Sequence, residues 1–122
     1  MSFFDDLEGV GPQPVWEGVA ARVMDGERIT MAVVELDPES VVPEHNHENE
    51  QLGVVLSGSL LFRIGDEARE LRPGALYRIP ANTPHSVETG PDGAVVVDIF
   101  SPVRDDWRTI PPESVRRPRW PT

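Results

Sequence analysis

The three histidines of the chain are spaced so that they could share one metal ion. His45 and His47 are two residues apart, and His85 follows the turn-forming pair Thr83-Pro84. In an extended segment, residues two apart point to the same face, so the first two imidazoles would converge. A neutral imidazole is the commonest metal ligand, and His85 on a neighbouring strand would complete a three-histidine face. The alternative is that these are ordinary surface or core histidines without a ligand.

Two glutamates and a glutamine follow the histidine pair. Gln51 has the same parity as His45 and His47, whereas Glu48 and Glu50 have the opposite parity. An extended segment would therefore turn Gln51 toward the imidazoles and both glutamates away from them. A β-bulge would break this parity and could bring Glu50 inward instead.

A second group of polar residues interrupts an apolar stretch near residue 100. Asp98 directly follows Ala94-Val95-Val96-Val97, and Phe100 and Arg104 come after it in the pattern Asp-x-Phe-x-Pro-x-Arg. If this stretch is a strand, Asp98 and Phe100 share one face. An unpaired charge is costly in such an apolar strand, so Asp98 needs either a partner or a function. One alternative is an ion pair between Asp98 and Arg104 that closes the end of a barrel.

The composition limits what these groups could do. The chain has 122 residues, which fits a single domain, and no Cys, which excludes disulfides, Cys-ligated metals and thiol catalysis. Its formal charge is −10, and every basic residue is Arg, so Schiff-base chemistry at Lys is excluded. Such an acidic surface repels phosphate backbones, so we expect no nucleic-acid partner. Without a long apolar run or a signal-peptide pattern, the chain is expected to be soluble and cytoplasmic, with no membrane contact.

The elements that must position these groups are predicted to be short strands. Apolar segments rich in Val, Ile, Leu and Phe alternate with clusters of Gly, Pro, Asn and Asp, which indicates an all-β sandwich or barrel. Strands are predicted at Val15–Ala20, Arg28–Leu36, Gln51–Ser57, Ser59–Ile64, Ala68–Leu71, Leu76–Ile79, His85–Glu88 and Ala94–Phe100. Turns are predicted at Asp37-Pro38, Gly65-Asp66, Arg72-Pro73-Gly74, Pro80–Pro84 and Thr89–Gly93.

The last segment, residues 101–122, differs from the rest because its prolines forbid a long helix or a central strand. Trp107 and Trp120 lie in this tail, and large aromatic side chains seldom stay fully wet. We expect one domain over residues 1–122, with a barrel at about residues 15–100 and an irregular tail that packs on the barrel or on a partner subunit. The three arginines at residues 116–119 are expected to form a local ion-pair region with Glu113 and the acidic body of the protein, rather than a basic patch for a partner.

The order and spacing of these residues resemble the two sequence motifs of the cupin superfamily. The first motif corresponds to His45-x-His47-x3-Gln51-x6-Gly58, and the second to Gly74-x5-Pro80-x-Asn82-x2-His85. This resemblance implies a single cupin-type β-barrel, also described as a double-stranded β-helix or jelly roll, over most of the chain. Glu39 and Asn82 stand where the family has glycine.

The cupin resemblance also implies a ligand set. By position, His45, His47, Gln51 and His85 would bind one divalent metal ion, and their types would accept Zn, Ni, Mn or Fe. Gln51 stands where the family usually has Glu, and an amide oxygen would leave the charge of the ion undiminished. Glu50 is the alternative fourth ligand.

Together with the histidine motif, the pattern from Asp98 to Arg104 resembles the small KdgF-type cupins of pectin and alginate breakdown. That resemblance implies a metal-dependent enzyme, isomerase-like or lyase-like, that converts an unsaturated uronate to its open-chain keto form by Lewis-acid and acid–base catalysis. By resemblance, Asp98 would transfer the proton, Arg104 would grip the substrate carboxylate, and Phe100 would shape the pocket. Tyr77, the only tyrosine, is a further candidate for the substrate pocket.

Two other functions fit the same residues. One is a metal-dependent dioxygenase acting on a small diketone or phenolic substrate, and the other is a non-catalytic module that binds a sugar or metabolite. Asp98 and Arg104 favour the uronate enzyme, because an anionic sugar explains both residues. We therefore expect a small anionic sugar or metabolite as the partner, and a homodimer that covers apolar edge strands.

Overall fold

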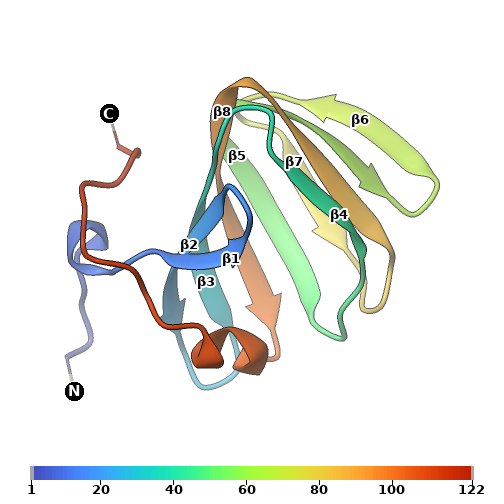
Figure 1. Cartoon of the computed structure of the whole chain (residues 1–122). Coiled ribbons are helices and arrows are strands. Elements are labelled where there is room, and N and C mark those ends of the chain that lie inside the picture. Colours follow the sequence, from blue (N-terminus) through green and yellow to red (C-terminus); the bar gives the residue numbers. More distant parts are fainter. Residues whose placement is uncertain (1, 122) are drawn as a thin grey trace.

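The computed structural model describes residues 2–121 and shows a protein built from strands with two short 3-10 helices (Figure 1). The strands are β1 (Gln13–Trp16), β2 (Val19–Asp25), β3 (Thr30–Leu36), β4 (Val41–His45), β5 (Glu50–Ile64), β6 (Glu67–Leu71), β7 (Leu76–Ile79) and β8 (His85–Ser101). The helices are η1 (Leu7–Gly9) and η2 (Asp105–Thr109). The predicted all-β fold class is confirmed. Neither helix found in residues 2–121 has the length and apolar character needed to span a membrane.

Two long strands, β5 and β8, pair with each other and close the barrel. Residues 50–58 of β5 pair with residues 94–101 of β8, and residues 94–100 of β8 also pair with β3. Residues 60–64 of β5 pair with residues 85–89 of β8, which lie beside β4. The register shifts between these halves at Gly58, where a Cβ would lie 1.9 Å from the carbonyl oxygen of Gly93. The two strands bend at this bulge and carry side chains from one half of the barrel to the other.

Two predicted breaks between strands are wrong, because the chain continues as a strand through the bulge at both places. The segments Gln51–Ser57 and Ser59–Ile64 are one strand, β5, and the segments His85–Glu88 and Ala94–Phe100 are joined in β8. The predicted turn at Thr89–Gly93 is therefore a bulge inside β8. Glycine with positive φ, as at Gly58 and Gly93, allows a strand to bend without leaving the sheet.

The N-terminal half differs from the prediction at two places. The predicted strand Val15–Ala20 is instead a hairpin, because Gly18 has a φ of 76° and turns the chain between β1 and β2. Strand β4 is absent from the prediction, because Pro43 and Glu44 interrupt its apolar pattern. The strands β3, β6 and β7 lie within two residues of their predicted bounds.

The remaining predicted turns all connect strands. Glu39 and Asn82, which stand at positions where the cupin family has glycine, have φ values of 57° and 61°. Both residues therefore adopt the left-handed conformation that glycine usually supplies, so these turns keep their geometry without it.

Residues 7–13 of the N-terminal segment and the C-terminal tail run side by side next to β2 and β3 (Figure 1). Gln13 donates from Nε2 to the carbonyl oxygens of Trp107 and Ile110, both at 2.8 Å. Trp107 is buried and its ring meets that of Phe100 edge-on at 5.0 Å between centroids. The described part of the tail thus contacts the barrel of its own chain.

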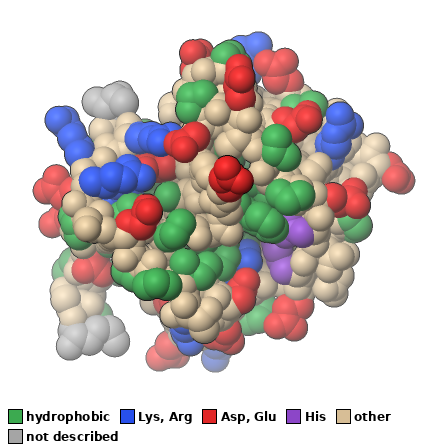
Figure 2. All heavy atoms as spheres, viewed as in Figure 1, with side chains coloured by type: hydrophobic (Ala, Val, Ile, Leu, Met, Phe, Trp, Pro, Cys, Tyr) green, Lys and Arg blue, Asp and Glu red, His purple; other side chains and the backbone are tan. Residues whose placement is uncertain are grey.

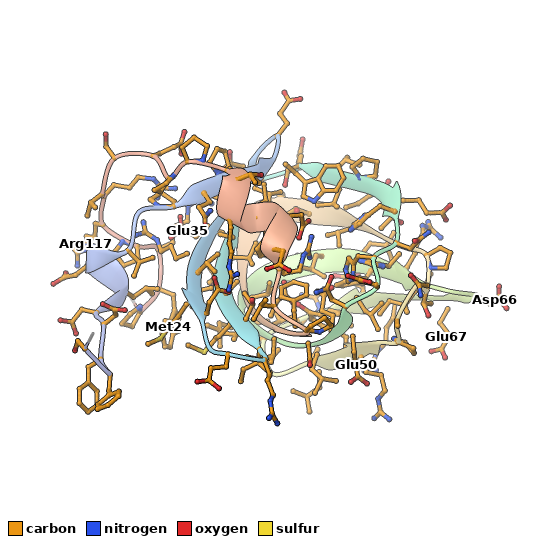
Figure 3. The ribbon with its side chains drawn as sticks, turned by 90° about the horizontal axis from the view of Figure 1, so that it is seen from below. Met24, Glu35, Glu50, Asp66, Glu67 and Arg117 are labelled. Carbon is orange, nitrogen blue, oxygen red and sulfur yellow. The ribbon has the colours of Figure 1, made fainter. Side chains whose placement is uncertain are left out.

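Glu35 links the C-terminal tail to Arg22, and Arg22 in turn bonds the N-terminal segment (Figure 3). Glu35 lies on the outward face of β3 but is only 1% exposed. Its carboxylate accepts hydrogen bonds from Nε of buried Arg22 at 3.3 Å and from the backbone N–H of Arg119 at 3.0 Å, and Arg116 Nη1 lies 2.9 Å from its other oxygen. Burial by itself would raise the pKa of Glu35, but the hydrogen bonds from Arg119 and Arg116 and the charges of Arg116 and Arg22 lower it. Arg22 also donates to the carbonyl oxygen of Val10 at 2.7 Å, which fastens the N-terminal segment.

The basic cluster of the tail forms ion pairs with acids of the barrel, as expected, but not with Glu113. Arg116 lies against Glu35, and Arg119 pairs with Asp37, whereas no ion pair to Glu113 is found among the described residues. Both acids belong to the barrel, because the tail lies across β3, which contains Glu35, and across the following turn, which contains Asp37.

Candidate active site

One cavity between the two halves of the barrel contains every residue predicted to do chemistry. Its lining includes His45, His47, Gln51, Tyr77, His85, Asp98, Phe100 and Arg104. Histidine side chains reach the surface beside hydrophobic side chains, so part of the histidine cluster contacts solvent on this face (Figure 2). Valine, leucine and aromatic side chains form most of the remaining wall, which places the polar groups in an apolar surrounding.

The three imidazoles converge. His45 ends β4 and pairs directly with His85 at the start of β8, while His47 lies two residues beyond β4. One ligand nitrogen from each ring lies within 4.8 Å of the others. The Nδ1 atoms of His45, His47 and His85 lie 2.8, 2.9 and 2.9 Å from the carbonyl oxygens of Pro43, Asn49 and Thr83. A carbonyl oxygen only accepts, so each Nδ1 carries the proton and each Nε2 keeps a lone pair for a metal.

Gln51 offers the fourth ligand atom. Its Oε1 lies 3.1 Å from Nε2 of His47, and its Nε2 donates to Oδ1 of Asp98 at 3.0 Å. Because the amide nitrogen of Gln51 donates to Asp98, the amide oxygen must face His47. The contact between this oxygen and Nε2 of His47 therefore brings together two atoms that each carry a lone pair. Ligand atoms that bind one metal at about 2.0–2.2 Å stand about 3 Å apart, so this contact fits two neighbouring coordination positions. Three imidazoles and an amide oxygen therefore fit a divalent ion.

Glu50 lies on the other side of β5. Its side chain is exposed and borders an outer groove with Leu52 and Arg78, away from the imidazoles. Glu50 and Gln51 are consecutive residues of a regular part of β5, so their side chains point to opposite faces. The bulge that could change this alternation lies further along the strand, at Gly58. This placement supports Gln51 over Glu50 as the fourth ligand.

Burial favours the neutral form of two of the imidazoles, those of His47 and His85. Burial, with smaller contributions from the neighbouring histidines and Arg104, lowers the pKa of His85 to about 4. Burial and the charge of Arg104 also lower the pKa of His47. Both rings are therefore available as ligands at neutral pH.

Asp98 lies on the inward face of β8, next to these ligands. Its Oδ1 accepts hydrogen bonds from Gln51 and from the hydroxyl of Tyr77. Burial raises the pKa of Asp98 to about 6, although both hydrogen bonds and the charge of Arg104 favour the ionised form. Burial and the nearby carboxylate raise the pKa of Tyr77 well above its usual value, so the hydroxyl stays protonated and donates.

Arg104 is held at the edge of the cavity by Asp106. Its Nε and Nη2 bond the two carboxylate oxygens of Asp106 at 3.0 and 2.8 Å. Its guanidinium carbon lies 4.7 Å from the centroid of the Phe100 ring and 4.1 Å from that of the Trp107 ring. The suggested ion pair between Arg104 and Asp98 is therefore wrong, because the tail turns Arg104 toward Asp106. Stacking and pairing together orient the guanidinium.

Two residues that line or support the site were missed by the sequence reasoning. Trp16 of β1 lines the cavity, and its ring centroid lies 5.0 Å from that of His45. Asn49 is buried and donates from Nδ2 to the carbonyl oxygens of Pro102 and Val103 at 2.6 and 3.2 Å. Because His47 donates to its carbonyl oxygen, Asn49 connects that histidine to the loop before Arg104. An Asn in an acidic stretch gives no sign of burial, so no local pattern could have shown this role.

Residues 32–100 match the family described as the cupin domain, which is more than half of the chain. The chain belongs to the cupin family. Its structure is also similar to that of an RmlC-like cupin from Shewanella frigidimarina NCIMB 400, with a TM-score of 0.81 and 19% identity, covering 88% of this chain and 96% of the other.

Among cupins, the chain resembles KdgF. It is 28% identical over 93 residues to the pectin degradation protein KdgF of Dickeya dadantii (strain 3937), a match that covers 75% of this chain and 84% of that protein. The structure of KdgF from Halomonas sp. is similar with a TM-score of 0.77 and 30% identity, covering 87% of this chain and 97% of the other. The polyketide cyclase RemF from Streptomyces resistomycificus is also similar, with a TM-score of 0.73 and 26% identity over 84% of this chain and 80% of the other. The predicted resemblance to the KdgF-type cupins is confirmed.

Proposed function

We propose that this cupin is a metal-dependent enzyme that converts a 4,5-unsaturated uronate monosaccharide to its open-chain keto form. The reaction is an isomerisation. The anomeric hydroxyl loses its proton as the bond between the anomeric carbon and the ring oxygen breaks, which leaves an aldehyde at C1 and an enolate at C5, and this enolate gains a proton at C4 to give the C5 ketone. No hydride, electron or co-substrate is required. The likeness to KdgF, a pectin degradation protein, supports the uronate-type substrate.

The observation that carries this proposal is that one carboxyl and one guanidinium face the same cavity as the histidine cluster. Asp98 is the only carboxyl among the residues that line the cavity. It can accept the proton of the anomeric hydroxyl and supply a proton to C4. Arg104 uses Nε and Nη2 for Asp106, which leaves Nη1 to bind the carboxylate of the sugar acid.

The remaining roles follow from position. His45, His47, His85 and Gln51 hold the divalent ion, which when bound supplies a Lewis acid for the oxygens of the substrate. Phe100 forms an apolar wall behind His47, with their ring centroids 5.8 Å apart.

The test is to load the chelated protein separately with Zn, Ni, Mn or Fe and to follow an unsaturated uronate by NMR. We expect the keto product to form with at least one metal, and Asp98→Asn to lose this activity. Glu50→Gln is the matched control, because it changes an exposed acid on the other side of β5 and should keep the activity. Oxygen uptake with a diketone and no ketonisation would favour a dioxygenase, and uronate binding without turnover would favour a binding module.

We also propose that the protein is a homodimer that covers the outer face of the sheet. Met24, Met31, Ile99 and Leu52 form one cross-strand row from β2 to β5. Met24, Met31 and Leu52 are 38%, 41% and 52% exposed, so the row leaves a continuous apolar surface in contact with water. Sedimentation should show a dimer that Met31→Glu dissociates, and a monomeric parent protein would refute this arrangement.

A further inference from the structure

Gly53 lies in the centre of a cross-strand row that joins Tyr77 to Asp98. It pairs with Tyr77 of β7 on one side and with Asp98 of β8 on the other. A Cβ placed on Gly53 would lie 2.1 Å from Cζ of Tyr77 and 2.3 Å from its hydroxyl oxygen. The phenol ring thus occupies the space that any side chain at position 53 would need. An isolated glycine inside a strand often marks such a close approach.

The ring of Tyr77 lies over the backbone of β5 at Gly53, and this position brings its hydroxyl to Asp98. The ring is buried and packs against Phe62, with centroids 4.7 Å apart, so it has little freedom to move elsewhere. Its hydroxyl donates to Oδ1 of Asp98, which also accepts from Gln51 at 3.0 Å. No hydrogen bond among residues 2–121 uses Oδ2 of Asp98. The carboxyl is therefore fastened by one oxygen, and the other is left for a ligand in the cavity.

We propose that Tyr77 is a positioning residue for Asp98 and that Gly53 is the residue that makes this contact possible. The inference rests on the proposed function, in which Asp98 transfers the proton. It also changes the role of Tyr77 from substrate contact to support of the reacting carboxyl. Without the hydroxyl, Asp98 can rotate, and a misplacement of about 1 Å can lower a rate by about 100-fold. The metal ligands and Arg104 would remain, so substrate binding should change little.

The first variant to test is Tyr77→Phe, which keeps the ring and removes the hydroxyl. We expect kcat to fall by about 10-fold to 100-fold while KM stays within about 2-fold. Bound metal and the thermal midpoint should stay close to those of the parent protein. A kcat within about 2-fold of the parent value would overturn the proposal.

The second variant is Gly53→Ala, which should displace the ring and lower both stability and kcat. Gly9→Ala is the matched control, because a Cβ at Gly9 meets no atom within 4 Å. Adding Tyr77→Leu to Gly53→Ala removes the overlap, so it should restore stability without restoring kcat. If kcat recovers together with stability, the role of Tyr77 is packing alone and the proposal is wrong.

A measurement without substrate separates this inference from the proposed function. Because Tyr77 is the only tyrosine, an isotope label at tyrosine Cζ gives a single NMR signal. This signal should shift in Asp98→Asn and should not shift in Glu50→Gln. A shift in a protein that does not ketonise uronates would leave the contact established and would refute the proposed function. An unchanged signal would overturn the contact itself.

Discussion

Replacing Glu35 with Gln should destabilise the protein by about 3 kcal/mol, because the buried guanidinium of Arg22 loses its counter-charge. Removing one partner of a buried ion pair costs about 3–5 kcal/mol, since the other charge stays desolvated. The side chains of Arg116 and Arg119 are 42% and 40% exposed, so water reaches the outer side of this cluster. Solvent screening therefore places the expected cost at the lower end of that range.

Chemical denaturation measures this cost, and limited trypsin digestion measures its local effect. Glu35 holds the tail through Arg116 and Arg119, so the variant should be cleaved faster after both arginines. Glu70→Gln is the control, because its pair with Arg72 is exposed and should contribute less than about 1 kcal/mol. If Glu35→Gln costs no more than Glu70→Gln, the buried cluster does not hold the chain ends.

The same carboxylate should make stability depend on pH. Its pKa in the folded protein lies below the ordinary value of 4.5, so the ionised form stabilises the fold above that value. This contribution is lost as the pH falls through the lowered pKa. Stability measured against pH should therefore fall less steeply in acid for Glu35→Gln than for the parent protein, and parallel curves would contradict the assignment.

Three further changes test the cavity. His85→Ala should weaken divalent metal binding by more than about 100-fold, and calorimetry on the chelated protein would measure it; unchanged binding would argue against convergence of the imidazoles. Arg104→Lys should raise KM for an unsaturated uronate about 10-fold, because a lysine ammonium cannot bond both oxygens of Asp106 and also hold a third nitrogen toward the substrate carboxylate. An unchanged KM would remove Arg104 from the carboxylate site. Thr30→Val should lower the free energy of unfolding by about 1–3 kcal/mol, because the buried Thr30 hydroxyl accepts a hydrogen bond from the backbone N–H of Arg104 at 2.9 Å. Chemical denaturation would measure this loss, with the exposed Thr109→Val as the control, and equal losses in the two variants would contradict the prediction.

Local spacing was sufficient to predict that the histidines form a cluster with Gln51 beside it. His45, His47 and Gln51 lie within seven residues of one another, and the inward direction of Gln51 followed from strand parity. Apolar segments between turn residues likewise predicted the all-β class, and the motif order predicted the cupin fold. The parity argument assumed an extended segment through His45 and His47; β4 ends at His45, yet the loop that follows still brings His47 to the same cluster.

Other contacts depend on register between distant strands. Tyr77 reaches Asp98 because β7 and β8 both align with Gly53 of β5, and nothing near any of these residues in the sequence specifies that alignment. Arg104 faces Asp106 rather than Asp98 because of the path that the tail takes after β8. The sequence by itself thus determined which residue types lie on one face of a strand, because that depends on alternation along the backbone. Only the tertiary structure decided which faces meet, because that depends on pairing and packing between segments far apart in the chain.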